Sequence, residues 1–354
     1  MRGGSSRTTS KTLVRTVGAV IAAMAAISAA GSAVQAQDAA GFFKGKTVKF
    51  VVGYSTGGGF DAYARMIAAP MGKALDATVV VENQPGAGGL VALNRVAAAP
   101  ADGLTIMIVD GTPAALGQLL GTENVRYDLA KIGHLGMIGA TRFVWLVNPA
   151  PPIKTLADAL KPGVKIRWAG GGATDGASGS ASVACEALRI DCHVVLGYKG
   201  SSDMLLAVQR DEMDALFLSE SSASLLVKST QARAVLTVSR DRSKLLPDVP
   251  TVFESAKLDT EQQWWMDFRA NLNDLGRILV ATGGVPADRL AVLQSSVKKV
   301  LTEPAMLAEG ARTGRHVEFQ EPEVARKKAV SVLEGVTAEQ KERIRAVALT
   351  KFVK

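Results

Sequence analysis

The chain has few of the sulfur and nitrogen side chains that bind zinc: its 354 residues include two cysteines and three histidines. His193 adjoins Cys192, but no Cys/His cluster has the spacing of a zinc site. His134, His193 and His316 also have no evident nucleophile as partner, and isolated histidines are usually structural or surface residues. We therefore expect no metal, no cofactor and no histidine-assisted catalysis.

Aromatic residues are also scarce, at 5% of the chain. No stretch interleaves basic and aromatic side chains, as a platform for single-stranded nucleic acid would. The formal net charge is +8, but four basic residues lie within the first fifteen positions, and without them it would fall to +4. A mildly basic surface does not indicate nucleic-acid binding, so we expect no nucleic-acid partner.

Long apolar runs are missing beyond the N-terminus. There, an acid-free basic region precedes an apolar core at 17–30 and small residues at 34–36; the basic residues are Arg2, Arg7, Lys11 and Arg15. This pattern predicts a Sec-type signal peptide over 1–36, a mature start near Gln37 and a periplasmic location. An uncleaved anchor is the alternative, although the core is short for a membrane span. No cysteine stands at the cut, which disfavours a lipid anchor.

The two cysteines, Cys185 and Cys192, lie between the end of an expected helix and the start of an expected strand. In an exported protein this spacing favours a disulfide, which would stabilise the fold by about 2.5 kcal/mol in the chain-entropy model. Two small buried thiols are the alternative, and a metal pair fits less well.

The glycine-rich turns are the most informative feature of the sequence. Gly57-Gly58-Gly59-Phe60-Asp61 sits between an apolar run at 48–52 and a helical pattern that begins at Phe60. Glycines allow a sharp turn and a close approach by a ligand, while the first N–H groups of the helix lack partners within it. Such a strand, turn and helix start form an anion site.

The segments that follow complete a pattern. A strand at 78–81 runs into Glu82-Asn83-Gln84-Pro85-Gly86-Ala87-Gly88-Gly89, and a Pro-Ala-Asp-Gly turn at 100–103 precedes a strand at 104–109. Together with GGGFDAYAR, this order closely resembles the substrate-binding receptors of tripartite tricarboxylate transporters, the TctC-like or Bug proteins. The resemblance continues through 197–201 and 246–254. Each motif is weak alone, but their ordered combination is specific.

Strands and helices continue to alternate, which predicts α/β sheets with mainly parallel strands. Further strands are expected at 143–147, 165–169, 193–196, 214–218, 234–238 and 277–280. The resemblance implies a type II periplasmic-binding-protein fold, in which two α/β lobes are joined by two hinge strands around a ligand cleft. A Pro-rich break at 148–152 and a segment near 235–239 are the expected crossings. Lobe I would then comprise 37–146 plus 240–354, and lobe II 147–239.

Lobe II repeats the glycine turn at 170–178, so two facing helix starts could each hold one carboxylate of a ligand. The resemblance implies that these loops bind it largely through backbone N–H groups and water. The expected ligand-binding residues are Tyr54, Ser55, Thr56, Gly57, Gly58, Gly59, Phe60, Asp61, Gly171, Gly172, Ala173, Thr174, Asp175, Ser178, Tyr198, Lys199 and Glu220.

Several of these residues have a plainer interpretation. Asp61 and Asp175 could each meet a positive or donor group of the ligand, or simply cap a helix. Lys199 could pair with a carboxylate or remain solvated. Thr56 stands where many family members have proline, and Glu220 where many have an Asp-Asn pair, so the usual ligand chemistry is not transferred. Tyr54 and Phe60 hint at an apolar ligand body.

Enzyme alternatives fit less well. The three glycines lack the G-x-G-x-x-G spacing of a dinucleotide site, and Ser180 replaces the last glycine of a nucleophile elbow around Ser178. The leading hypothesis is a monomeric periplasmic receptor that captures a small organic acid, performs no chemistry and delivers it to the permease subunits of a tripartite transporter. The alternatives are a sensor subunit and a periplasmic enzyme acting on a carboxylate or phosphate ester.

Overall fold

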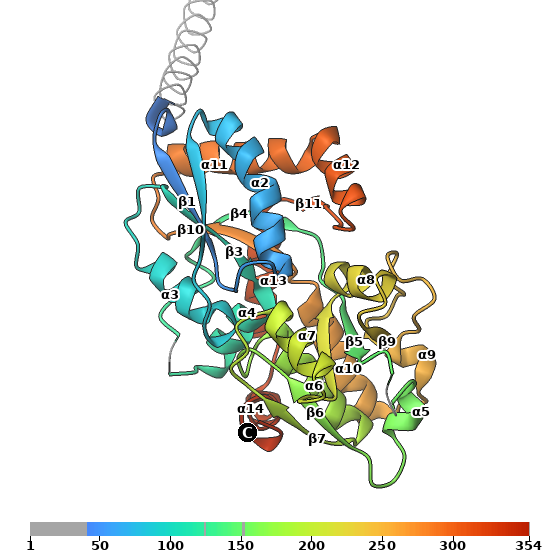
Figure 1. Ribbon diagram of the computed structural model, residues 1–354. Helices are drawn as coiled ribbons and strands as arrows, with labels where there is room; N and C mark the ends of the chain where they lie inside the picture. The colour runs from blue at the N-terminus through green and yellow to red at the C-terminus, as the bar shows by residue number, and fades with distance from the viewer. Residues whose placement is uncertain (1–40, 124, 151–152, 354) are drawn as a thin grey trace, which may run out of the picture.

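The computed structural model describes residues 41–123, 125–150 and 153–353. The predicted signal peptide over 1–36 and the start at Gln37 lie outside these residues. Within them, no helix has both the length and the apolar character needed to cross a membrane. Two sheets, each flanked by helices, divide the molecule into two lobes (Figure 1).

Lobe I is built on a sheet with the strand order β11-β4-β10-β3-β1-β2. Its strands are β1 (Thr47–Val52), β2 (Thr78–Asn83), β3 (Thr105–Asp110), β4 (Gly133–Ile138), β10 (Arg277–Ala281) and β11 (Phe319–Gln320). The surrounding helices are α2 (Gly59–Leu75), α3 (Leu90–Ala97), α4 (Gly111–Leu120), α11 (Ala287–Thr302), α12 (Pro304–Arg312) and α13 (Pro322–Glu334). The strands β1, β2 and β3 are parallel, whereas β10 runs antiparallel to β3 and β4.

Lobe II is built on a sheet with the order β7-β6-β8-β5-β9. Its strands are β5 (Phe143–Val147), β6 (Lys165–Ala169), β7 (Asp191–Val195), β8 (Ala215–Ser219) and β9 (Arg233–Val238). Its helices are α5 (Leu156–Ala159), α6 (Gly176–Leu188), α7 (Ser201–Gln209), α8 (Glu220–Lys228), α9 (Val252–Ser255) and α10 (Thr260–Asn273). The helix α14 (Ala338–Ala346) and the short π-helix η2 (Val347–Lys351) end the chain beside this lobe (Figure 1).

The two sheets share one topology. In each, three parallel strands in the order second, first, third are followed by an antiparallel strand that arrives from the other sheet. This antiparallel strand is β10 in lobe I and β5 in lobe II. The predicted two-lobed α/β fold is therefore confirmed. As expected, most strands of each sheet run in one direction, and the strands that run the opposite way are β10 and β11 in lobe I and β5 in lobe II.

Both predicted positions at which the chain passes from one lobe to the other are wrong. β5 already pairs with β8 and β9, so the chain changes sheets at 139–142 and not at 148–152. β9 belongs wholly to lobe II, and α10 packs on α6 of the same lobe. The chain enters the sheet of lobe I again only at β10. The return crossing is therefore at 274–276 rather than near 235–239. β5, which precedes the Pro-rich stretch, is an interior strand of the lobe II sheet, and sequence alone does not distinguish the end of such a strand from the start of a linker.

The assignment of 240–354 to lobe I needs a second correction. Figure 1 shows α10 beside α6, and the C-terminal end of the chain beside β7. Val353 forms a parallel bridge with Val194 in β7, and the Phe352 carbonyl accepts a hydrogen bond from Val194 N–H. The chain thus returns to lobe II a second time, which adds a third connection between the lobes.

The cysteines join α6 to β7. Cys185 and Cys192 form a disulfide with a Cα–Cα distance of 6.3 Å, and both side chains are buried. The predicted bond is therefore present. It closes the turn in which Arg189 adopts a left-handed conformation with a φ of 56°.

Candidate functional site

A cavity of about 60 Å³ lies between the lobes. Its wall combines aromatic rings, small residues and two carboxylates. The residues that line it are Tyr54, Gly58, Gly59, Phe60, Asp110, Phe143, Asp175, Gly176, Ala177, Ser201, Met204, Phe217, Leu218, Ser219 and Ser222. Lobe I contributes the residues of the first glycine turn and Asp110, and lobe II contributes the others.

Five helices begin at this cavity. The first residue or the N-cap of α2, α4, α6, α7 and α8 lies in its wall. Asp110 caps α4 and Asp175 caps α6, whereas α2, α7 and α8 have no side-chain cap. Unpartnered N–H groups and the helix dipole make each helix start electropositive. The convergence arises because these helices follow strands whose carboxyl ends meet at the cleft.

Asp61 stabilises the first glycine turn from within. Its Oδ2 accepts a hydrogen bond from Gly57 N–H at 2.9 Å, and Arg65 forms an ion pair with it at 2.9 Å. Although burial acts in the opposite direction, the hydrogen bonds from Arg65 and Gly57 lower the pKa of Asp61. Asp61 does not line the cavity. The structure therefore favours the plainer interpretation of Asp61, in which its side chain stabilises its own loop.

Asp175 occupies the anion site predicted for lobe II. Its Oδ2 accepts hydrogen bonds from Gly171 N–H at 2.8 Å and Gly172 N–H at 2.9 Å, and its Oδ1 accepts one from Ser178 N–H at 2.7 Å. The donors that the prediction reserved for a ligand carboxylate are thus engaged by the protein's own carboxylate. Its carboxylate also brings a negative charge to the cavity wall.

The lobes are closed on one another. Ser55 N–H donates to the Lys199 carbonyl at 3.0 Å, and the hydroxyls of Tyr63 and Ser221 lie 3.1 Å apart. At Gly172, an added Cβ would lie 2.6 Å from the Ala87 carbonyl carbon in the opposite lobe. Such close backbone contact explains why a glycine is needed there.

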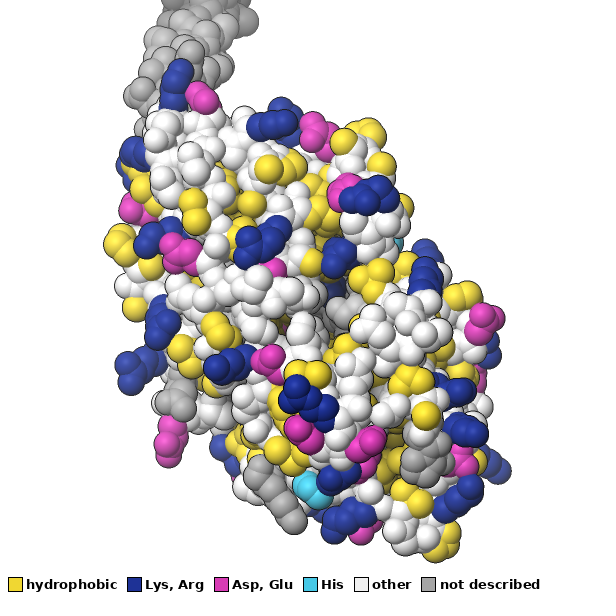
Figure 2. All heavy atoms as spheres, in the orientation of Figure 1, with side chains coloured by type: hydrophobic (Ala, Val, Ile, Leu, Met, Phe, Trp, Pro, Cys, Tyr) yellow, Lys and Arg dark blue, Asp and Glu magenta, His cyan; other side chains and the backbone are white. Residues whose placement is uncertain are grey.

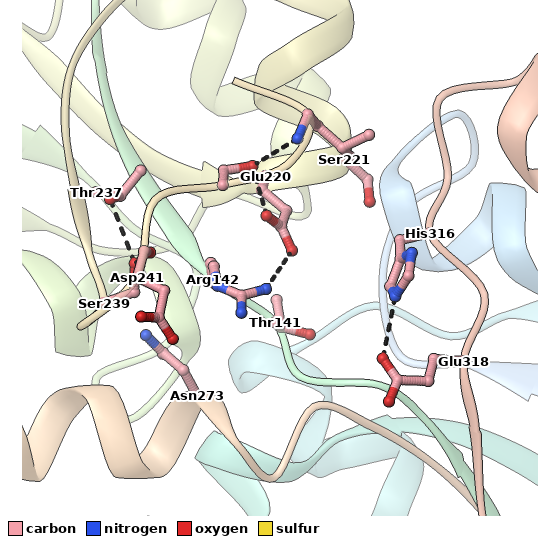
Figure 3. A network of polar contacts seen from close by, with 12 residues as sticks. Thr141, Arg142, Glu220, Ser221, Thr237, Ser239, Asp241, Asn273, His316 and Glu318 are labelled. Atoms are coloured by element: carbon pink, nitrogen blue, oxygen red, sulfur yellow. Dashed lines mark hydrogen bonds and ion pairs between the residues drawn. The ribbon is translucent and has the colours of Figure 1, made fainter. Parts of the chain in front are cut away.

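Glu220 lies at the crossing between the lobes and not in the cavity. Its carboxylate accepts a hydrogen bond from Arg142 at 3.3 Å (Figure 3). It accepts another from the Ser243 hydroxyl. Its backbone N–H donates to the Arg142 carbonyl. Arg142 belongs to the crossing segment at 139–142. Glu220 therefore ties α8 to this segment.

The structure brings part of the predicted set into the cavity wall. Tyr54, Gly58, Gly59, Phe60 and Asp175 line it. The remaining candidates do not line it in this closed form: Ser55, Thr56, Gly57, Asp61, Gly171, Gly172, Ala173, Thr174, Ser178, Tyr198, Lys199 and Glu220. Lys199 contributes its carbonyl to closure, while its side chain is exposed.

Sequence reasoning missed Asp110, which is 5% exposed. Burial raises its pKa to about 6, against the opposing hydrogen bond that its Oδ1 accepts from Thr112 N–H at 3.1 Å. A signal for it existed, because Asp110 ends a strand of the same parallel set as the first glycine turn. Polar residues at the carboxyl ends of neighbouring parallel strands meet at one sheet edge.

Other chemistries find little support in the described residues. No group of three or more His, Cys, Asp or Glu side chains among them is arranged to hold a metal ion. His134 contacts the Leu129 carbonyl. His316 contacts Glu318 (Figure 3), and neither histidine lines the cavity. On the face seen in Figure 2, Lys and Arg are interspersed with Asp and Glu, without one large basic patch.

The chain is similar to a set of bacterial proteins. The model of the tripartite tricarboxylate transporter family receptor, TctC, matches residues 63–323. Protein BugT of Bordetella pertussis is 27% identical over 247 residues, which cover 66% of this chain and 72% of BugT. A UPF0065 protein of the same organism is 25% identical over 295 residues, which cover 81% of this chain and 84% of the relative.

Solved structures share the fold. The periplasmic binding protein BugD matches with a TM-score of 0.73 at 21% identity, over 87% of this chain and 99% of BugD. MatC from Rhodopseudomonas palustris, solved with bound malate, matches with a TM-score of 0.67 at 23% identity, over 86% of this chain and 99% of MatC. With the two-lobed topology and a family match over most of its length, the chain belongs to the TctC family, the solute-binding receptors of tripartite tricarboxylate transporters, of which the Bug proteins are members.

Proposed function

We propose that this protein is a periplasmic receptor that captures a small organic acid between its lobes and presents the closed form to the permease subunits of a tripartite transporter. The observation that carries the proposal is the convergence of five helix starts on one cavity between the lobes. Three of them, α2, α7 and α8, have no side-chain cap. The first N–H of α8 donates to the Arg142 carbonyl, and the remaining N–H groups of these helix starts are available to an anion.

The uncapped helix starts lie next to one another. An added Cβ at Gly58 would lie 3.1 Å from Ser201 Oγ in α7, and one at Gly59 would lie 2.8 Å from Ser222 Oγ in α8. Each helix start contributes up to about 2 kcal/mol to an anion in a partly buried site. Three together, with serine hydroxyls as further donors, give a carboxylate a binding site without a basic side chain.

Relatives support an organic acid as the ligand. MatC was solved with malate, and another structure of similar fold, from the same organism, was solved with adipate. Both are under 25% identical to this chain, so they suggest a ligand class and not a particular compound. In the closed form the starts of α7 and α8 lie against the first glycine turn, so a permease that contacts both lobes there would distinguish the closed form.

A thermal-shift screen of the protein from Gln37 onward against organic acids tests this proposal. A ligand at about 100 times its Kd should stabilise the protein by ~2.7 kcal/mol, a shift of several degrees. Recovery of the compound unchanged is expected for a receptor. Consumption of the compound would instead indicate the enzyme alternative. Binding of a compound that no tripartite-transporter permease takes up would indicate a sensor subunit. The absence of a shift with every carboxylate would refute the proposal.

A further inference from the structure

The charged side chains of the cavity wall are all negative. Asp110 and Asp175 line it, and within the described part of the chain no Lys, Arg or His does. Both carboxylates are nearly sealed from solvent, with exposed fractions of 5% and 3%. An organic acid that enters this cavity would meet like charges at short range, so the proposed function needs a positive charge near the wall.

Two arginines are buried next to the wall. Arg277 is 3% exposed and Arg269 is 1% exposed. The guanidinium carbon of Arg277 lies 5.4 Å from the ring centroid of Phe60, and that of Arg269 lies 5.0 Å from the ring centroid of Phe143. Both rings line the cavity, so each guanidinium group contacts an aromatic residue of the wall.

Arg277 is the neighbour of Asp110 in the sheet of lobe I. The register of the antiparallel strands β10 and β3 places Arg277 directly opposite Asp110. Opposite residues of such a pair project from the same face of the sheet. Burial raises the pKa of Asp110 to about 6, and the charges of Arg269 and Arg277 act against this rise. Arg277 is therefore a counter-charge for the carboxylate of lobe I.

Arg269 stands in a similar relation to Asp175. It donates to the Gly176 carbonyl at 3.0 Å and to the Ser180 hydroxyl at 2.9 Å, both in α6, the helix that Asp175 caps. Burial lowers the pKa of Arg269 to about 10, and the charges of Asp110 and Asp175 oppose this shift. Each lobe thus supplies one buried carboxylate and one buried guanidinium group, which together carry no net charge.

Hydrogen bonding does not explain why Arg277 is buried. Its Nη1 donates to Thr141 Oγ1 at 3.1 Å, but Nε and Nη2 are buried and have no acceptor among the residues that the structure describes. A buried donor without an acceptor destabilises a fold. This arginine is therefore a poor choice for stability alone, which favours a role for its charge in the neighbouring site.

We infer that Arg277 is a positioning residue of the binding site, whose buried charge offsets that of Asp110 and so allows the cavity to accept an anion. Arg269 offsets Asp175 in the same way from lobe II. Neither arginine lines the cavity, so both act through the wall rather than by contact with the ligand. The inference rests on the proposed function and adds to it the residues that make an acidic wall compatible with an organic acid.

Calorimetry at pH 8, where Asp110 is ionised, tests the inference. The probe is whichever of butyrate, glutarate, adipate and the other acids of the screen binds the wild type most tightly. Arg277→Met should weaken its binding at least about tenfold. A unit charge about 10 Å from the charge of a ligand, at an effective dielectric constant of about 20, changes an affinity by that much. Arg277→Lys keeps the charge and should lose less.

Asp110→Asn tests the same charge balance from the other side. Alone, it should strengthen binding of the probe at least about threefold, because it removes a negative charge from the wall. Combined with Arg277→Met, it should restore the affinity to within about threefold of the wild type. An arginine with a purely structural role would not be rescued by removal of a carboxylate. If Arg277→Met does not fold, Asp110→Asn alone decides.

Arg167→Met is the matched control. Arg167 is also a strand residue, in β6, with an aspartate partner, Asp214, at 2.8 Å, but it does not line the cavity or contact a ring of its wall. Its replacement should change the affinity for the probe less than about twofold. A larger loss would mean that any strand arginine influences binding, which contradicts the assignment to Arg277.

The results separate the inference from the proposed function. The inference is overturned, and the receptor function stands, if Arg277→Met leaves the affinity unchanged or if the double variant binds as weakly as Arg277→Met. It is also overturned if Asp110→Asn does not bind the probe more tightly than the wild type does. If no carboxylate of the screen binds the wild type, both are overturned.

Discussion

At the scale of single residues, three aspartates illustrate how one side-chain type serves different roles. Asp61 and Asp175 fold back onto backbone N–H groups of their own loops, whereas Asp110 caps a helix with one oxygen and faces the cavity. The first two contacts fall within four positions along the chain, so a capping role could be predicted from the sequence. The position of Asp110 depends on which strand ends meet, and its only sequence signal is its place at the end of an expected strand.

Asp110→Asn should make the protein without ligand more stable at neutral pH. The folded-state pKa of Asp110 is about 6, above the ordinary value of 3.8, so the ionised carboxylate destabilises the fold at higher pH. Two pKa units correspond to at most about 3 kcal/mol. Asparagine keeps the cap of α4, since its side-chain oxygen can still accept from Thr112 N–H.

Urea denaturation at several pH values measures this effect. The advantage of Asp110→Asn should be small near pH 4, grow as the pH rises to about 6 and stay constant above it. The groups that act on Asp110, namely Asp175, Arg269, Arg277 and the Thr112 N–H, are unchanged in the variant. A variant less stable than the wild type at pH 7 would show that Asp110 stabilises the fold.

Gly58→Val should abolish binding of organic acids with little loss of stability. The backbone at Gly58 is extended, with a φ of −78°, so valine fits its conformation. Its side chain would however enter the cavity beside Ser201 Oγ, 3.1 Å from the added Cβ. Calorimetry with the ligand from the screen measures the loss, and Gly58→Ala should give a smaller one. Normal affinity in a folded Gly58→Val protein would remove this turn from the site.

At the scale of elements, most strands and their order could be predicted, because apolar runs between glycine or proline turns are local signals. β5 and β6 begin and end where predicted, at 143–147 and 165–169. β4 was missed since its six residues, two of them glycine and one histidine, are all buried and show neither alternation nor β-branched enrichment. The pairing of β5 and β10 with distant strands has no local signal.

The disulfide between α6 and β7 should stabilise lobe II. The cysteines are seven positions apart, and the chain-entropy model gives about 2.5 kcal/mol for a loop of this size. A double variant, Cys185→Ser and Cys192→Ser, should lose at least that amount, because it also places hydroxyls at buried positions. Urea denaturation measures the difference. Reduction of the wild type should have a smaller effect than the double variant; equal stability of oxidised and reduced protein would contradict the prediction.

At the scale of the whole molecule, closure depends on backbone contacts between the lobes. The Ser55 N–H to Lys199 carbonyl bond and the close approach of Gly172 to Ala87 join segments more than 80 positions apart. In proteins whose lobes close around a ligand, the closed and open forms differ in free energy by a few kcal/mol. Small steric changes therefore shift the equilibrium between the two forms.

Gly172→Ala should favour the open form. Its Cβ would lie 2.6 Å from the Ala87 carbonyl carbon, a contact between backbone segments that cannot be relieved by a rotamer change. We expect a larger radius of gyration in X-ray scattering and weaker binding of the ligand, with unchanged secondary structure. Gly179→Ala is the matched control, as its Cβ would have no neighbour closer than 4.0 Å. Identical scattering of both variants would show that the contact does not control closure.

Sequence motifs were enough to predict the family, the two-lobed α/β class, the disulfide and the glycine turn of lobe I, since each depends on residues close together in the chain or on motifs in a fixed order. The crossing points, the return of the C-terminus to lobe II and the place of Asp110 in the cavity wall became visible only in the folded molecule. These depend on which strand ends and helix starts meet across the sheets. Contacts between segments remote in the chain leave no periodic trace in the sequence.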